Sequence, residues 1–167
     1  MITIREYEEH EAQSVGRLIA DTYSEFNLSF ATPEELADCL GPFRYARSQE
    51  PAHQEAIARL IRSQMVYVAD CDGEIVGVLR GRRERLGSLF VSGKHHRQGI
   101  GRRLVERFER ECSSQNMKVI RVAATLQAVP FYLAMGYRRS TGVRNGWSFD
   151  GRLPVQPMRK VLKEGGG

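Results

Sequence analysis

The 167-residue sequence lacks the features that mark disulfide-rich, membrane-spanning, secreted and repeat proteins. Its three cysteines, Cys39, Cys71 and Cys112, are odd in number, far apart and without Cys-x-x-Cys spacing. No apolar run approaches membrane-spanning length, residues 1–6 contain no apolar signal region, and no internal repeat is visible. We therefore expect a cytoplasmic protein with reduced, buried thiols, without a disulfide frame, a metal site or a membrane partner.

The overall composition is that of an ordinary globular protein. Hydrophobic residues make up 41% of the chain and charged residues 27%, which is enough apolar content for one substantial core. The chain length suits one domain. We expect this domain to span residues 1–164, with a helical insertion at about 27–64 and a flexible tail at 165–167.

Positive charge is concentrated in one part of the chain. Between Arg80 and Arg107 there are nine Lys or Arg residues and two acids, Glu84 and Glu106, so this segment has a charge of +7. Because the whole chain has a formal charge of +5, the remaining residues sum to −2. A local field of this kind attracts a polyanion. One cluster without interleaved aromatic residues is weak support for nucleic-acid binding, so we expect no nucleic-acid partner.

Periodicity and turn residues predict the order of the elements. Strands are predicted at 2–7, 65–69, 74–80, 86–91 and 118–123, and helices at 8–24, 32–41, from 51, 99–113 and about 128–136. Asp72 and Gly73 predict a hairpin turn. Thr32 and Glu35 predict a capping box. Residues 138–162 predict two strands joined by a polar turn, at Asn145 and Gly146 or at Asp150 and Gly151.

The stretch 89–104 combines a strand, a basic loop and a helix that begins at Gly99, Ile100 and Gly101. Glycine lets a ligand approach the backbone closely, and the first amides of a helix have no intrahelical acceptor. The helix dipole makes this end positive, so the pattern favours a phosphate site. The glycines alone leave a simple tight turn open. A dinucleotide fingerprint would need glycine where Leu104 stands, and the Gly-Lys-Ser/Thr ending of a Walker loop is absent.

Two motifs in this order resemble a known family. The run from His96 to Gly101, His-Arg-Gln-Gly-Ile-Gly, resembles the phosphate loop Gln/Arg-x-x-Gly-x-Gly/Ala of the GNAT superfamily of acetyl-CoA-dependent N-acetyltransferases, with His96 in place of Gln or Arg. About 30 residues later, Phe131, Tyr132, Gly136 and Tyr137 resemble the family pattern Phe-Tyr-x-x-x-Gly-Phe/Tyr. Periodicity alone would explain this second stretch as an amphipathic helix with two core aromatics.

The resemblance implies an α/β fold of GNAT type: a mixed, mostly antiparallel central sheet of about six or seven strands, flanked by helices, with a parallel strand pair splayed around the coenzyme. It implies acetyl-CoA as co-substrate, no metal, and transfer of the acetyl group by direct attack of a primary amine of a small molecule, peptide or protein. The alternative is a non-catalytic acyl-CoA-binding or sensing module with the same fold. We leave open whether the chain forms a homodimer.

The resemblance also assigns residues to roles. Tyr132 is the expected catalytic acid that protonates the departing thiolate. The expected coenzyme-binding residues are Leu89, Phe90, Val91, His96, Arg97, Gln98, Gly99, Ile100, Gly101, Arg102, Thr125, Ala128 and Phe131.

The resemblance does not supply a general base. Several relatives carry a glutamate at the position of Arg85, but an arginine stays protonated and cannot act as a base. We expect Arg85 to contact a carboxylate on the acceptor instead, since arginine pairs bidentately with carboxylates. Ser88, His95 and His96 are weaker candidates for the base.

The helical insertion is expected to form a wall of the acceptor pocket, by the same resemblance. The aromatic candidates to line that wall are Tyr23, Phe26, Phe43 and Tyr45, for each of which core packing is the ordinary role.

Overall fold

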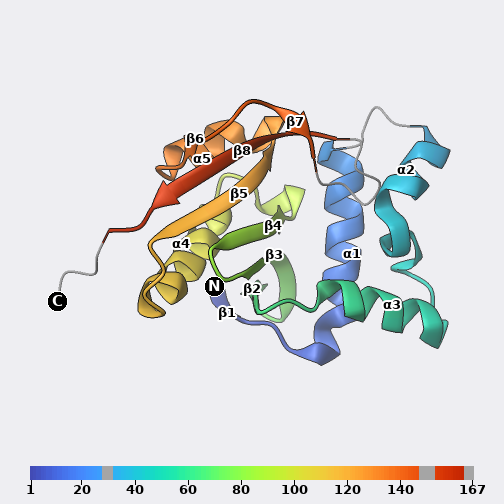
Figure 1. Cartoon of the computed structure of the whole chain (residues 1–167). Helices are drawn as coiled ribbons and strands as arrows, with labels where there is room; N and C mark the ends of the chain where they lie inside the picture. Colours follow the sequence, from blue (N-terminus) through green and yellow to red (C-terminus); the bar gives the residue numbers. More distant parts are fainter. Residues whose placement is uncertain (28–31, 147–152, 164–167) are drawn as a thin grey trace.

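The computed structural model describes residues 1–27, 32–146 and 153–163 (Figure 1). This part of the chain forms an eight-stranded sheet in the order β1-β2-β3-β4-β5-β8-β6, with β7 also paired to β8. The strands are β1 (Ile2–Glu6), β2 (Met65–Cys71), β3 (Glu74–Arg82), β4 (Arg85–Val91), β5 (Val119–Thr125), β6 (Arg138–Arg139), β7 (Arg144–Asn145) and β8 (Pro154–Val161). The helices are α1 (Ala12–Thr22), α2 (Pro33–Leu40), α3 (Pro51–Ile61), α4 (Ile100–Ser114) and α5 (Val129–Ala134). Shorter helical turns lie at Glu9–Glu11, Tyr23–Asn27, Gly41–Tyr45, Gly93–His95 and Leu126–Ala128.

The predicted fold class is confirmed. Every strand pair is antiparallel except β4 and β5, which run parallel. The described residues contain eight strands where about six or seven were expected. The excess arises because the segment between α5 and β8 forms two separate two-residue strands, β6 and β7, which both pair with β8.

Side chains that alternate along β2 fill two cores on opposite faces of the sheet. Tyr67 and Ala69 belong to the core beneath α4, whereas Val68 belongs to the core beneath α1 and α3. Figure 1 shows α4 on one side of the sheet and α1 to α3 on the other. Successive side chains of a strand point to opposite faces, so this central strand is buried on both.

The turn chemistry of the chain is largely as predicted. Asp72 and Gly73 have φ angles of 51° and 98°, which suits a two-residue hairpin turn. The Thr32 hydroxyl accepts from the Glu35 amide at 3.2 Å, and the Glu35 carboxylate accepts from the Thr32 amide at 3.0 Å, so the capping box is present.

One of the two turns proposed after residue 138 is wrong. Asn145 pairs with Pro154, and the Gly146 amide donates to the Leu153 carbonyl at 2.7 Å, so the strand pairing continues through this point. The alternative turn, at Asp150 and Gly151, lies outside the described residues, as does the expected tail at 165–167.

Cysteine burial is close to the expectation. Cys39 and Cys112 are buried, whereas Cys71 at the end of β2 is only half-buried. Within the described ranges, no group of three or more His, Cys, Asp or Glu side chains is placed to hold a metal ion. In the same ranges, no helix has both the length and the apolar character that crossing a bilayer requires.

Gly81 of β3 gives a test of how α4 packs on the sheet. A Cβ at this position would lie 2.9 Å from Cζ of the fully buried Phe108 ring and 3.1 Å from the Arg85 carbonyl oxygen. We predict that Gly81→Ala lowers the free energy of unfolding by about 1–3 kcal/mol, the usual cost of overpacking a core. Chemical denaturation measures this loss. Gly142→Ala is the control, since a Cβ there meets nothing within 4 Å; equal stability of the two variants would contradict the packing described.

Candidate functional site

The parallel strands β4 and β5 separate soon after they meet. Only Arg85 with Arg121 and Leu86 with Val122 are paired. Beyond these residues β4 continues against β3 as far as Val91, and β5 continues against β8 as far as Thr125. The facing edges of the two strands therefore have free backbone groups, which a ligand can pair with.

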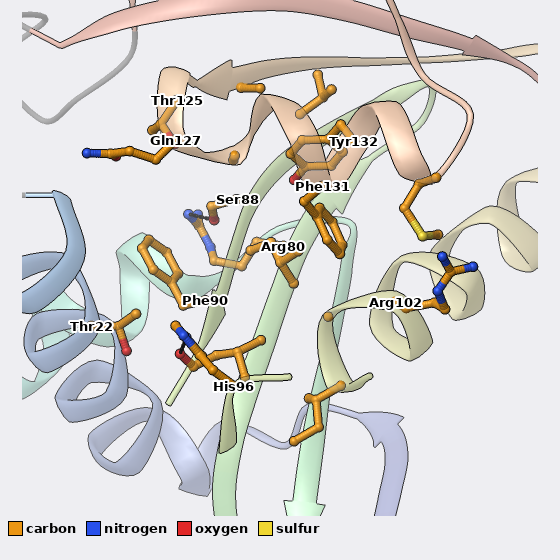
Figure 2. A pocket seen from close by; sticks show the side chains of 18 of the residues that line it. Thr22, Arg80, Ser88, Phe90, His96, Arg102, Thr125, Gln127, Phe131 and Tyr132 are labelled. Carbon is orange, nitrogen blue, oxygen red and sulfur yellow. Dashed lines mark hydrogen bonds between the residues drawn. The ribbon is translucent and has the colours of Figure 1, made fainter. Parts of the chain in front are cut away.

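A cavity of about 870 Å³ lies at this split. Figure 2 shows β4 along its floor, α5 above it and the first turn of α4 at its side. Its volume is in the range of small-molecule and cofactor sites. The predicted coenzyme residues that line it are Leu89, Phe90, Val91, His96, Arg97, Gly99, Ile100, Gly101, Arg102, Thr125, Ala128 and Phe131. Gln98 is exposed and is not among the lining residues.

The loop before α4 has the backbone conformation that its glycine predicts. Gly99 is the N-cap residue with a φ of 75°, and Arg97 also has a positive φ, of 62°. The first helical bond runs from the Arg103 amide to the Gly99 carbonyl at 3.0 Å. The amides of Ile100 and Gly101 thus have no intrahelical acceptor and lie at the cavity with the positive end of the helix dipole. This arrangement suits a phosphate group.

Two histidines hold or flank this loop. His96 Nε2 lies 2.8 Å from the Val91 carbonyl oxygen, which can only accept, so the imidazole donates and ties the loop to the end of β4. His95 Nδ1 is buried without a hydrogen-bond partner among the described residues. Both side chains line the cavity.

Tyr132 lies on α5 against the cavity and is only 4% exposed. Its ring packs edge-on against Phe131, with 5.0 Å between ring centroids, and against Tyr137, with 5.4 Å. Burial raises the pKa of Tyr132 above its ordinary value, so the hydroxyl keeps its proton at neutral pH. No described residue hydrogen-bonds this hydroxyl, whereas the Tyr137 hydroxyl donates to Glu109 at 3.1 Å. Tyr132 therefore has a proton to donate toward the cavity.

The charge that faces the cavity is positive. Among the described lining residues none is Asp or Glu, while Arg80, Arg97 and Arg102 are present. The Arg102 guanidinium lies 3.8 Å from the Glu106 carboxylate on the next turn of α4. Arg97 and the α4 amides make one end of the cavity suitable for an anion.

Arg85 and Arg80 differ in their relation to the cavity. Arg85 lies at the first position of β4, opposite Arg82, and is not among the lining residues. Its predicted contact with an acceptor carboxylate stays a prediction. Arg80, which the sequence showed only as one member of the basic cluster, lines the cavity beside Ser88 (Figure 2). Burial lowers the pKa of Arg80 from its ordinary value. The sequence signal that could have identified Arg80 is its position as a charged residue directly after the apolar run 75–79.

The aromatic wall is partly as expected. Tyr23 and Phe43 line the cavity, together with Thr22, which the sequence did not single out. Tyr45 is 38% exposed and instead stacks on His53, with 3.9 Å between ring centroids. The side chain of Phe26 lies outside the part of the chain that is described.

Comparison with known proteins supplies independent evidence about this fold. Residues 27–162 match the sequence family described as an acetyltransferase (GNAT) domain. No curated protein resembles the chain closely enough in sequence to count as a match.

Solved structures of low sequence identity share the whole fold. A GCN5-related N-acetyltransferase from Rhodopseudomonas palustris is similar at a TM-score of 0.73 and 18% identity, over 96% of this chain and 95% of that one. The PaiA N-acetyltransferase from Thermoplasma acidophilum, in complex with coenzyme A, is similar at a TM-score of 0.70 and 15% identity, over 97% of this chain and 99% of that one. The ribosomal-protein-S18-alanine N-acetyltransferase from Escherichia coli is similar at a TM-score of 0.66 and 15% identity, over 99% of this chain and 97% of that one.

The two glycines at the start of α4 should respond differently to alanine. Gly99 has the left-handed conformation, so Gly99→Ala should lower the free energy of unfolding by about 1–2 kcal/mol. Gly101 is helical, and a Cβ there would meet the Phe131 ring at an ordinary 3.4 Å. Gly101→Ala should therefore leave stability unchanged or raise it by up to about 1 kcal/mol. Thermal unfolding of both variants measures the contrast, and a Gly99→Ala protein as stable as the parent would be inconsistent with this loop geometry.

Proposed function

Because the chain belongs to the GNAT acetyltransferase family, we propose that it binds acetyl-CoA at the split between β4 and β5 and transfers the acetyl group to a primary amine. The single observation that carries this proposal is the cavity where the free β4 edge, the α4 N-terminus and Tyr132 meet. That PaiA from Thermoplasma acidophilum is a fold neighbour in complex with coenzyme A supports this choice of ligand.

Each part of the coenzyme has a matching partner in this proposal. The pyrophosphate lies on the amides of Ile100 and Gly101, with Arg97 adding charge. The pantetheine arm, which carries amide groups, pairs with the free edge of β4 at 89–91. The thioester then lies near Tyr132, with its carbonyl polarised by a β4 amide. Holding both reactants in one cavity supplies a large part of the rate, because the reaction becomes effectively unimolecular.

The acetyl transfer follows from these positions. The amine nitrogen bonds to the thioester carbonyl carbon, the carbon–sulfur bond breaks, and the sulfur takes the proton of the Tyr132 hydroxyl. Solvent returns a proton to the tyrosinate and accepts the surplus proton of the nitrogen. The amine must be neutral to attack, and no carboxylate among the described lining residues can deprotonate it. The imidazole of His95, a water molecule, or arrival of the amine in neutral form fills this role.

A non-catalytic acyl-CoA-binding or sensing module is the second candidate. The same lack of an acid among the described lining residues favours it. Turnover separates the two functions, since both predict coenzyme binding and only the first releases free thiol. A screen of primary amines with detection of released coenzyme A is the direct test.

We predict that acetyl-CoA stabilises the fold. A ligand at 100 times its dissociation constant should raise the free energy of unfolding by about 2.7 kcal/mol. Gly101→Glu should abolish this gain, because the added carboxylate would repel a phosphate at the α4 N-terminus. Thermal shift with millimolar acetyl-CoA measures both. Gly142→Glu is the control, since it adds the same charge at an open position away from the cavity. If acetyl-CoA gives no thermal shift in the parent protein, the proposed function is wrong.

We predict that Tyr132→Phe lowers turnover by about 10²–10⁴-fold, at the lower end because a thiolate is a tolerable leaving group. Coenzyme affinity and stability should change little, since the ring and its packing are kept. Because burial raises the pKa of Tyr132 above about 10, any loss of activity due to its ionisation should appear only above that pH. Between pH 7 and 9 activity should rise as the acceptor amine loses its proton.

Tyr137→Phe is the matched control for this change. It removes the hydroxyl of a neighbouring buried tyrosine, which contacts Glu109 and does not line the cavity. It should retain turnover. If Tyr132→Phe and Tyr137→Phe are equally active, Tyr132 is a core aromatic only.

A further inference from the structure

Arg80 is the cation at the cavity that the phosphate loop does not explain. It lies on β3 opposite Ser88 of β4, on the sheet face that α1 and α3 cover. Its Nε donates to the Ile61 carbonyl at 3.0 Å, and its Nη2 donates to the Leu60 carbonyl. Its Nη1 lies 3.5 Å from the Ser88 hydroxyl (Figure 2). The guanidinium is therefore held in one place by the last carbonyls of α3.

These contacts leave the charge of Arg80 only partly offset. A guanidinium has five N–H donors, of which three are directed to the groups just named. The carbonyl end of α3 is the negative end of its dipole, which offsets part of the charge. No described residue brings a carboxylate to Arg80, and no Asp or Glu is among the described lining residues. A half-buried cation without an anion is costly, so the site favours a ligand that brings one.

The location of Arg80 separates it from the coenzyme phosphates. The amides that suit the pyrophosphate lie at the start of α4, which packs on one face of the sheet, with Arg97 in the loop before it. Arg80 lies on β3 on the opposite face, held by the last carbonyls of α3. Tyr23 and Phe43, which also line the cavity, belong to the core on this same face of the sheet. An anion at Arg80 would thus belong to the second substrate.

We propose that Arg80 binds a carboxylate of the acceptor, so that the acceptor is a low-molecular-weight primary amine that carries its own carboxylate. The amine part of this statement rests on the proposed function, while the carboxylate part rests on the geometry of Arg80. A small acceptor fits because the arginine faces a cavity of about 870 Å³ that the coenzyme arm also enters. Arginine suits a carboxylate because its planar fork matches the two oxygens.

The competing explanation is purely structural: Arg80 caps α3 and attaches it to the sheet. Both explanations predict that loss of Arg80 affects stability. Only the proposal predicts discrimination between an acid and its uncharged amide. The experiment therefore compares ω-amino acids of three to six carbons with their primary amides, as ligands of the protein saturated with coenzyme A.

Calorimetric titration of the parent protein should show at least one acid of the series binding about tenfold or more tightly than its amide. Arg80→Met should remove this preference, because it weakens the binding of the acid and leaves the binding of the amide unchanged. Arg80→Lys should retain part of it, as a point charge without the fork. Arg82→Met is the control, since it removes the same charge from the same strand at an exposed position outside the cavity lining. It should bind like the parent.

Three results would overturn the proposal. The first is that the parent protein binds acid and amide equally, or binds neither, and the second is that Arg80→Met keeps the preference for the acid. The third is that Arg85→Ala loses the preference instead, which would place the carboxylate at the residue predicted from the sequence. If Arg80→Met does not fold, the parent comparison and Arg80→Lys still decide. Failure of the proposed function has a different signature, because acetyl-CoA would then give no thermal shift, whatever the carboxylates do.

Discussion

The site depends on how soon the parallel pairing of β4 and β5 ends. Two residue pairs hold these strands together, at Arg85 and Leu86, and β4 then runs on beside β3 alone. A continuous ladder would use the backbone groups of 89–91 within the sheet and leave no room for a ligand. The early end of the pairing exposes them and opens the cavity. It also places the α4 N-terminus and α5 on either side of the same opening.

The two buried faces of the sheet fix the β4 side of this split. Val78 and Leu79 of β3 are fully buried in opposite cores, one beneath α1 and α3 and the other beneath α4. Gly77, next to them, lets α4 approach closely, since a Cβ there would lie 3.1–3.3 Å from side chains of Leu104, Ile100 and Ala69. The helix start and the strand edge are thereby fixed relative to each other, as a preorganised binding site requires.

Local sequence signals predicted the elements and the phosphate loop. The positive φ at Gly99, the capping box at Thr32 and the Asp72 turn each follow from residue chemistry within a few positions. The family resemblance added Tyr132 and the coenzyme residues, nearly all of which line one cavity. Their roles in binding and catalysis stay predictions.

Counting along the strand directed attention to Arg85, whose contact with an acceptor carboxylate stays a prediction. The register shifts between Arg80 and Gly81, which pair with Ser88 and Leu86, so Gly87 is an extra residue in β4. A bulge of this kind changes which face the following side chains occupy, and composition does not reveal it. The position of Arg80 at the cavity, opposite Ser88 and next to this irregularity, therefore could not be predicted from residue spacing. Long-range pairing, unlike turn chemistry, has no local signature.

The most direct test of the account is an NMR titration of the ¹⁵N-labelled protein with coenzyme A. Binding at the split predicts that the largest amide shift changes occur at Leu89, Phe90 and Val91 and from Gly99 to Arg102, with little change at β1 or at the C-terminal end of α4. Such a pattern would place the ligand between β4 and the α4 N-terminus. Changes spread over the basic surface without a maximum at these amides, or none at millimolar coenzyme A, would contradict the central claim.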